Sequence, residues 1–229
     1  MASDDSPFDS DIDDQLSDAF IERTLKSSFE KTPHDFIPLG ALREIVTKDS
    51  ICKAMNINSS TKEDGQLVDF VLAKASATFA TATGIHLKPK ELKSVMTLFK
   101  EHKFDDNKLP IERWSSDEFK NNPTKGIRHP FASMDKLAKN GYGKIWTKSR
   151  IWEFQKTQST FRVPVFSTDQ SNHDLGEFTV PFVGKRSLQA EGGAFGKVSQ
   201  YEIHPDHIKD PSSPVSGSCL FVGHCVTLS

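Results

Sequence analysis

The sequence predicts an α+β protein, with helices in its first half and a short antiparallel β element near its end. Three observations support this fold class. Apolar residues recur at helical spacing over 14–105, which predicts an α-helical domain. Prolines, glycines and isolated aromatic residues make 106–177 an irregular, aromatic-rich linker. Within 178–208, β-prone segments flank a glycine cluster, which indicates paired strands.

Residues 1–13 form an acidic, Asp- and Ser-rich tail that we expect to be disordered. The tail lacks the apolar stretch of a signal or transit peptide, and no run of about 18 apolar residues indicates a membrane span. A net charge of −2 gives no indication of binding to nucleic acid or to a membrane. Three cysteines, an odd number, are typical of reduced thiols. We therefore expect an intracellular protein, cytoplasmic or nuclear, that is not secreted.

The first expected helix starts near Asp13 or Asp14, and Pro33 limits how far it can run. A second, short helix is expected over 39–47, where apolar residues share one face. A third short helix is expected over 51–55.

Thr61 followed by Asp64 is close to the capping-box pattern and predicts a helix start. Apolar spacing then predicts one long helix that ends at Gly84. A further helix is expected to start at Pro89 and to bury an apolar face that includes Phe99. These helices complete the domain over 14–105.

The linker over 106–177 is predicted to hold one or two helical turns at 133–139. Aromatic residues from Trp146 and Trp152 to Phe166 are expected to form a packing cluster.

After the linker, 178–182 is predicted to be extended. The segments 187–188 and 198–203 flank the glycine run and are expected to pair as an antiparallel hairpin. The tail over 209–229 loses its charged residues from 211 onward and is expected to be disordered.

The glycine run Glu-Gly-Gly-Ala-Phe-Gly-Lys-Val occupies 191–198. A P-loop is excluded because Lys197 is followed by Val198 and not by a hydroxyl residue that could hold Mg²⁺. A dinucleotide site is disfavoured because a β-prone segment, halted by Pro205, follows the glycines where a helix is required. Two interpretations remain: a strand–loop–strand phosphate cradle, or a tight turn without a ligand.

The run resembles the glycine-rich loop of protein kinases, G-x-G-x-x-G-x-V, with Gly193, Gly196 and Val198 in their places. Glu191 stands in place of the first glycine, with Gly192 beside it. The resemblance implies that a lid over ATP is shaped by the following cofactor-binding residues: Gly192, Gly193, Phe195, Gly196 and Val198.

The context of the run resembles a group of filamentous-fungal protein kinase-like proteins. The similar segments are 201–207, 152–167 and 180–182. The resemblance implies an incomplete kinase N-lobe over 178–208, and ATP with Mg²⁺ as the cofactor of the parent family. The parent activity would be ATP-dependent phosphorylation of Ser or Thr.

Phosphoryl transfer by a kinase needs a third-strand lysine, an H-R-D-type base and a D-F-G-type metal ligand. Neither string occurs in the chain, and Lys209 is the only lysine after Val198. We expect this chain to be the N-terminal part of a kinase-like protein that lacks the catalytic residues. It should therefore be inactive and should not bind ATP tightly.

Two other functions remain open. The helical domain could form a non-catalytic module that binds a protein partner, or the glycine run could be a plain turn in an unrelated protein. A metal site is not predicted, because His204, Asp206 and His207 match no common zinc spacing with the Cys219 region.

Overall fold

The computed structural model mixes helices and strands and describes residues 10–29, 34–111, 145, 148–167, 179–186, 197–209 and 220–225. The chain forms two compact units. The helical unit comprises 1–22 and 42–162, and the β unit comprises 23–41 and 163–229. The predicted domains follow one another along the sequence, whereas 23–41 belongs to the β unit although helices precede and follow it.

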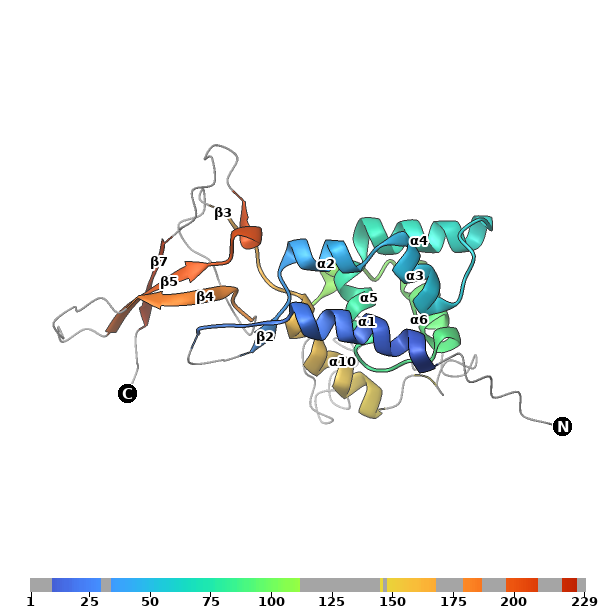
Figure 1. Ribbon diagram of the computed structural model, residues 1–229, viewed down its shortest axis with the longest axis horizontal. Helices are drawn as coiled ribbons and strands as arrows, with labels where there is room; N and C mark the ends of the chain where they lie inside the picture. The colour runs from blue at the N-terminus through green and yellow to red at the C-terminus, as the bar shows by residue number, and fades with distance from the viewer. Residues whose placement is uncertain are drawn as a thin grey trace, which may run out of the picture. The chain divides into compact units, whose positions relative to one another are not determined.

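Figure 1 labels the helices. Their bounds are α1 (Ser10–Arg23), α2 (Leu39–Ile45), α3 (Lys48–Met55), α4 (Lys62–Lys74), α5 (Ser76–Thr83), α6 (Pro89–Glu101), the 3₁₀ helix η1 (Asp106–Lys108) and α10 (Lys148–Phe161). Thr61 caps α4 as predicted, because its Oγ1 accepts a hydrogen bond from the N–H of Asp64 at 3.3 Å. Within the described ranges, no helix is long and apolar enough to cross a membrane.

The long helix predicted to end at Gly84 is divided into α4 and α5 at Ala75. Ala75 has φ −136° and ψ 30°, which lies outside the α-helical region, and α5 begins at the next residue. Gly84 follows the end of α5, as predicted. The apolar spacing runs across the break because Ala75 and Phe79 are both fully buried.

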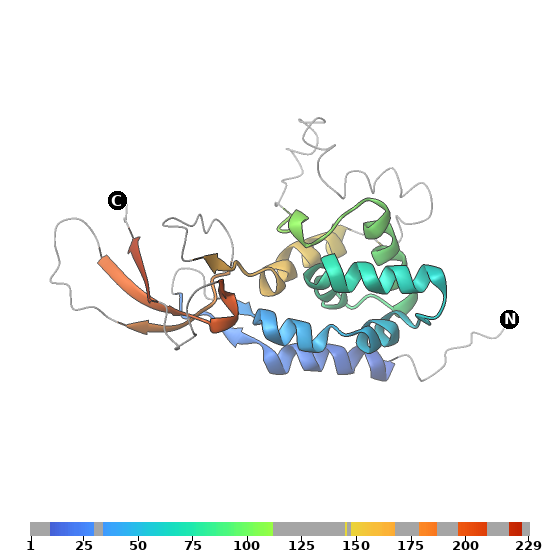
Figure 2. The same cartoon turned by 90° about the horizontal axis from the view of Figure 1, so that it is seen from above.

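Helix α5 lies in the core of the helical unit, where residues 77–83 are all buried. Its neighbours are α4, α6 and α10, whose ribbons can be followed in Figure 2. Most of its side chains are Ala or Thr, and small side chains let neighbouring backbones approach closely. The hydroxyls of Thr81 and Thr83 donate to the carbonyls of Ala77 and Phe79, so both buried hydroxyls are satisfied.

Asp106 of η1 caps the N-terminus of α5. Its carboxylate accepts hydrogen bonds from the N–H of Ala77 at 3.1 Å and from the N–H and Oγ1 of Thr78, both at 2.8 Å. Ala75, the residue at the N-cap position, makes no side-chain cap of its own. Burial raises the pKa of the Asp106 carboxyl, and the hydrogen bonds from Thr78 and Ala77 oppose that rise.

Helix α10 occupies 148–161, within the predicted irregular linker. Phe154 and Phe161 lie on its buried face, seven residues apart, which is two helical turns. Packing of these two aromatic residues is therefore confirmed, whereas Trp146 of the predicted cluster lies outside the described residues. The expectation that Trp152 packs with them is wrong: Trp152 is 54% exposed, and the Nζ of Lys156 lies 5.5 Å from its ring centroid.

Polar contacts hold α10 to the rest of the helical unit. The buried amide of Gln158 bonds both backbone groups of Ile111: its Oε1 accepts from the N–H at 2.7 Å, and its Nε2 donates to the carbonyl at 2.9 Å. Arg150 and Glu91 form a bidentate ion pair with N–O distances of 3.1 and 3.0 Å. The first contact joins α10 to the backbone after η1, and the second joins α10 to α6.

The β unit contains three small sheets in its described part. The strands are β1 (Leu25–Lys26), β2 (Asp35–Phe36), β3 (Phe166–Ser167), β4 (Phe182–Arg186), β5 (Lys197–Ile203), β6 (Ile208–Lys209) and β7 (Leu220–Cys225), and η3 (Pro205–His207) is a 3₁₀ helix. Strands β1 and β2 pair antiparallel, β3 and β6 pair parallel, and the third sheet has the order β4-β5-β7 with antiparallel pairs. Strand β7 lies within 209–229, where the sequence predicts disorder.

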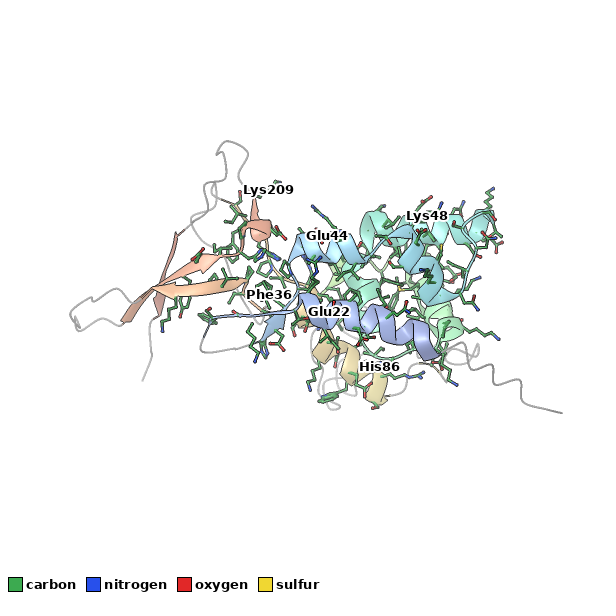
Figure 3. All side chains as sticks on the ribbon, in the orientation of Figure 1. Glu22, Phe36, Glu44, Lys48, His86 and Lys209 are labelled. Atoms are coloured by element: carbon green, nitrogen blue, oxygen red, sulfur yellow. The ribbon has the colours of Figure 1, made fainter. Side chains whose placement is uncertain are left out.

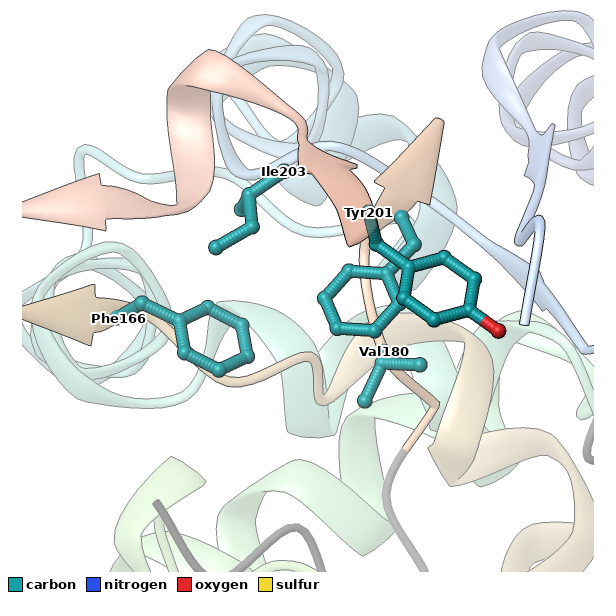
Figure 4. Packing of buried hydrophobic residues seen from close by; sticks show 5 residues of the cluster. Phe166, Val180, Tyr201 and Ile203 are labelled. Atoms are coloured by element: carbon teal, nitrogen blue, oxygen red, sulfur yellow. The ribbon is translucent and has the colours of Figure 1, made fainter. Parts of the chain in front are cut away.

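The core of the β unit is an aromatic and aliphatic cluster. Its members are Phe166, Val180, Phe182, Tyr201 and Ile203. The rings of Phe182 and Tyr201 stack with centroids 4.8 Å apart. Figure 4 shows the cluster, with the hydroxyl of Tyr201 directed away from Phe166.

Candidate functional site

The candidate site is the β4–β5 hairpin, because its strands stand on either side of the glycine run in the sequence. Phe182, Tyr201 and Ile203 are buried, whereas Val183 is 38% exposed, which is the alternation of a strand with one buried face. Phe182 pairs with Ile203, and a register shift follows it along β4. An antiparallel hairpin is confirmed, with β4 as its first described strand; the predicted first strand, 187–188, lies outside the described residues.

Four of the five predicted cofactor-binding residues lie outside the described part of the chain: Gly192, Gly193, Phe195 and Gly196. The fifth, Val198, lies in β5, the strand in which the resemblance places it. Val198 pairs with His224 of β7. The structure therefore places the strands that flank the run and one of the predicted residues.

Strand β7 is the third strand of this sheet and lies beside β5. Its sequence is Leu-Phe-Val-Gly-His-Cys, with no lysine and no acidic residue. Strand β7 therefore brings no lysine side chain to the sheet.

Residues 23–41, which come before the second stretch of the helical unit in the sequence, also contact the β unit's strands and η3. We call residues 23–41 the strap; the structure describes 23–29 and 34–41 of it. The strap carries the β1–β2 pair and Phe36, a fully buried side chain labelled in Figure 3. The Phe36 ring lies edge-on to the imidazoles of His204 and His207, with centroids 6.3 and 6.0 Å away.

His207 connects three segments of the β unit. Its Nε2 accepts a hydrogen bond from the N–H of Leu39 at 3.2 Å, and its Nδ1 lies 3.1 Å from the carbonyl oxygen of Pro164. The neutral imidazole with its proton on Nδ1 satisfies both contacts. The side chain is 1% exposed, and burial lowers the pKa of His207 to about 4.

Asp206 makes the neighbouring contact to the strap. Its carboxylate accepts a hydrogen bond from the N–H of Gly40 at 2.9 Å. A Cβ at position 40 would lie 2.5 Å from Oδ2 of Asp206, so a side chain there would displace the carboxylate. His204, at the N-cap of η3, accepts from the N–H of Asp206. Together, Asp206 and His207 bond the first two N–H groups of α2.

Sequence reasoning identified His204, Asp206 and His207 only as an unsupported metal group. The contacts of His207 and Asp206 join positions more than 160 residues apart in the sequence, to Leu39 and Gly40. Neither the sequence around Leu39 and Gly40 nor the sequence around Asp206 and His207 contains a motif that predicts these contacts. One signal was present in retrospect: Leu39-Gly40 starts a helix with no Ser, Thr, Asp or Asn before it, so its N–H groups need a distant partner.

Comparison with known proteins identifies no relative, because no family model, no curated protein and no solved structure matches the chain.

Proposed function

We propose that the β4–β5 hairpin is the glycine-loop hairpin of a protein kinase-like nucleotide-binding lobe. The observation that carries the proposal is the antiparallel pairing of β4 with β5 on either side of the glycine run, with Val198 in the second strand. A glycine-rich loop between two such strands covers the phosphates of ATP in kinases. In this proposal Gly192, Gly193, Phe195 and Gly196 form the cover, and Val198 contacts the base. The parent activity would be Mg²⁺- and ATP-dependent phosphorylation of Ser or Thr.

We further propose that these 229 residues do not catalyse phosphoryl transfer themselves. The kinase lysine that holds the phosphates lies on the third strand of the lobe, and metal ions bridge the phosphate oxygens. Strand β7, third in this sheet, has no lysine, and the chain contains no H-R-D or D-F-G string. Without these groups, the phosphate charge of a bound nucleotide would lack its main partners.

We expect the full chain to bind ATP with an affinity weaker than about millimolar, because the phosphate-holding lysine and the metal ligands are missing. Isothermal titration calorimetry with ATP in excess Mg²⁺, repeated with EDTA, measures this directly. Mg²⁺-dependent binding in the micromolar range would contradict the non-catalytic part of the proposal.

The kinase-like origin has a separate test that does not depend on affinity. Sequencing the transcript and the genome beyond the codon for Ser229 would show whether kinase strings follow in any frame. An A-x-K, H-R-D and D-F-G series in that order would support the proposal. A downstream region without them would favour a plain turn.

A second candidate function is a protein-interaction module built on the helical unit. The observation that favours it is the exposure of large apolar side chains on its helices, with Trp152 at 54% and Ile21 at 70%. Tryptophan is among the residues most enriched at energetically important interface positions. This function would not require the glycine run.

A photo-crosslinking amino acid placed at Trp152 in cells tests this second function. We expect one defined protein to be crosslinked from this position. The matched control is the same amino acid at Leu72, an exposed apolar residue of α4. Identical crosslinks from both positions would indicate random capture and would contradict a binding surface at α10.

A further inference from the structure

The strap contacts the first strand of the hairpin. The N–H of Ser28 donates a hydrogen bond to the carbonyl of Phe182 at 2.6 Å, and Phe182 is the first residue of β4. The Phe29 ring lies edge-on to the rings of Phe182 and Tyr201, with centroids 5.9 and 5.7 Å away. One backbone bond and one aromatic side chain of the strap therefore meet both strands of the hairpin.

The other end of the strap contacts the segment that leaves the second strand. Helix η3 begins two residues after Ile203, the last residue of β5. Its Asp206 and His207 bond the N–H groups of Gly40 and Leu39, as described above. The strap is thus attached at the start of β4 and just beyond the end of β5.

A sheet of three short strands such as β4-β5-β7 is stable in water only when further structure covers an apolar face. Here Phe29 is packed against the core cluster of the β unit, and Phe36 is fully buried in the same unit. Full burial of the Phe36 side chain and partial burial of the Phe29 side chain are a large stabilising contribution for so small a unit. The strap thus adds the side chains of Phe29 and Phe36 to the apolar core that residues 163–229 form.

We propose that the strap is a brace for the β4–β5 hairpin, so that strap and hairpin open and close as one cooperative unit. The strap continues directly into α1 at one end and into the rest of α2 at the other. The proposal holds whether or not the hairpin binds a nucleotide.

Hydrogen exchange of backbone amides, followed by NMR on the full chain, tests the brace. The variant is Phe29→Ala, which removes the aromatic contact with Phe182 and Tyr201. We expect the amides of β4 and β5, together with those of Leu39 and Gly40, to exchange about tenfold faster or more. The amides of α6 should keep their rates. Leu72→Ala, on α4, is the control and should change neither group of the β unit.

Faster exchange at Leu39 and Gly40 with unchanged rates in β4 and β5 would overturn the proposal, because the strap would then open alone. Unchanged rates in both groups would overturn it too. Phe29→Ala could also unfold the whole β unit. In that case the amides throughout β4 and β5 should lose their protection while those of α6 keep it, and this result supports cooperative opening. Phe29→Leu, which keeps apolar volume, should then give a smaller acceleration of the same amides.

Discussion

Lowering the pH from about 6.5 to about 4 should destabilise the β unit by up to about 3 kcal/mol, because folding keeps His207 neutral. The unfolded imidazole takes up a proton near its ordinary pKa of 6.5, whereas burial lowers the pKa of the folded group to about 4. Between these values the unfolded state holds more protons, so the free energy of unfolding falls as the pH falls. The stabilisation is complete above pH 6.5 and is lost by about pH 4.

The hydrogen bonds of His207 also predict that protonation destabilises the β unit. A protonated ring would carry hydrogens on both nitrogens, so Nε2 could not accept from the N–H of Leu39. The neighbouring charged groups act in opposite directions, since His204 lowers the pKa of His207 and Asp206 raises it. Burial is the largest cause and lowers the pKa of His207, whereas the hydrogen bond with the carbonyl of Pro164 raises it.

NMR titration of the His207 ring protons between pH 3.5 and 8 checks the folded pKa directly. Urea unfolding at a series of pH values, with β4 and β5 resonances as the probe, checks the stability. In His207→Leu the dependence on pH between 6.5 and 4 should become flatter than in the natural chain. A folded pKa near 6.5, or the same slope in both chains, would contradict the prediction.

Replacing Asp106 by Ala should destabilise the helical unit by about 3 kcal/mol. The substitution removes a half-buried carboxylate that accepts three hydrogen bonds from Ala77 and Thr78 at the start of α5. Those donors are shielded from water, and a buried donor without a partner costs about 1–3 kcal/mol. Urea unfolding followed by circular dichroism at 222 nm measures the loss.

Two variants calibrate this result. Asp106→Asn keeps an acceptor oxygen but loses the negative charge beside the helix N-terminus, so we expect an intermediate loss. Asp105→Ala removes a more exposed acceptor, bonded to the N–H of Asn107, and should cost less than about 1 kcal/mol. Equal losses for Asp105→Ala and Asp106→Ala would show that the cap of α5 is not the cause.

Local signals in the sequence predicted the features that depend on neighbouring residues. Thr61 and Asp64 lie three residues apart, so the start of α4 could be predicted from a few letters. The second strand of the hairpin, predicted over 198–203 and observed as β5, followed from the β-prone residues after the glycine run. The break at Ala75 could not be predicted in this way, because the group that caps α5 is Asp106, 29 residues away from Ala77.

The remaining differences have the same physical origin. Helix α10 was not predicted because Trp152, which is exposed, was assigned to an aromatic cluster together with Phe154 and Phe161. Without Trp152, the seven-residue spacing of Phe154 and Phe161 fits two helical turns. Strand β7 is short and uncharged, and its partner β5 is separated from it in the sequence. The strap looked like part of a helical domain because α1 and α2 flank it. Of the candidate site, the position of Val198 in a strand and the antiparallel pairing of that strand were predictable, whereas the contacts of His207 were not.

The alternation of the two units along the chain limits how the β unit can be inherited or transplanted. A gene fragment encoding only 163–229 would omit Phe29 and Phe36, whose side chains pack within that unit. Recombination within the region encoding 42–162 would separate two stretches that form one compact unit. The β unit therefore cannot be transferred as one continuous stretch of sequence. Any fusion, exchange or shortened version that retains it must also include residues 23–41.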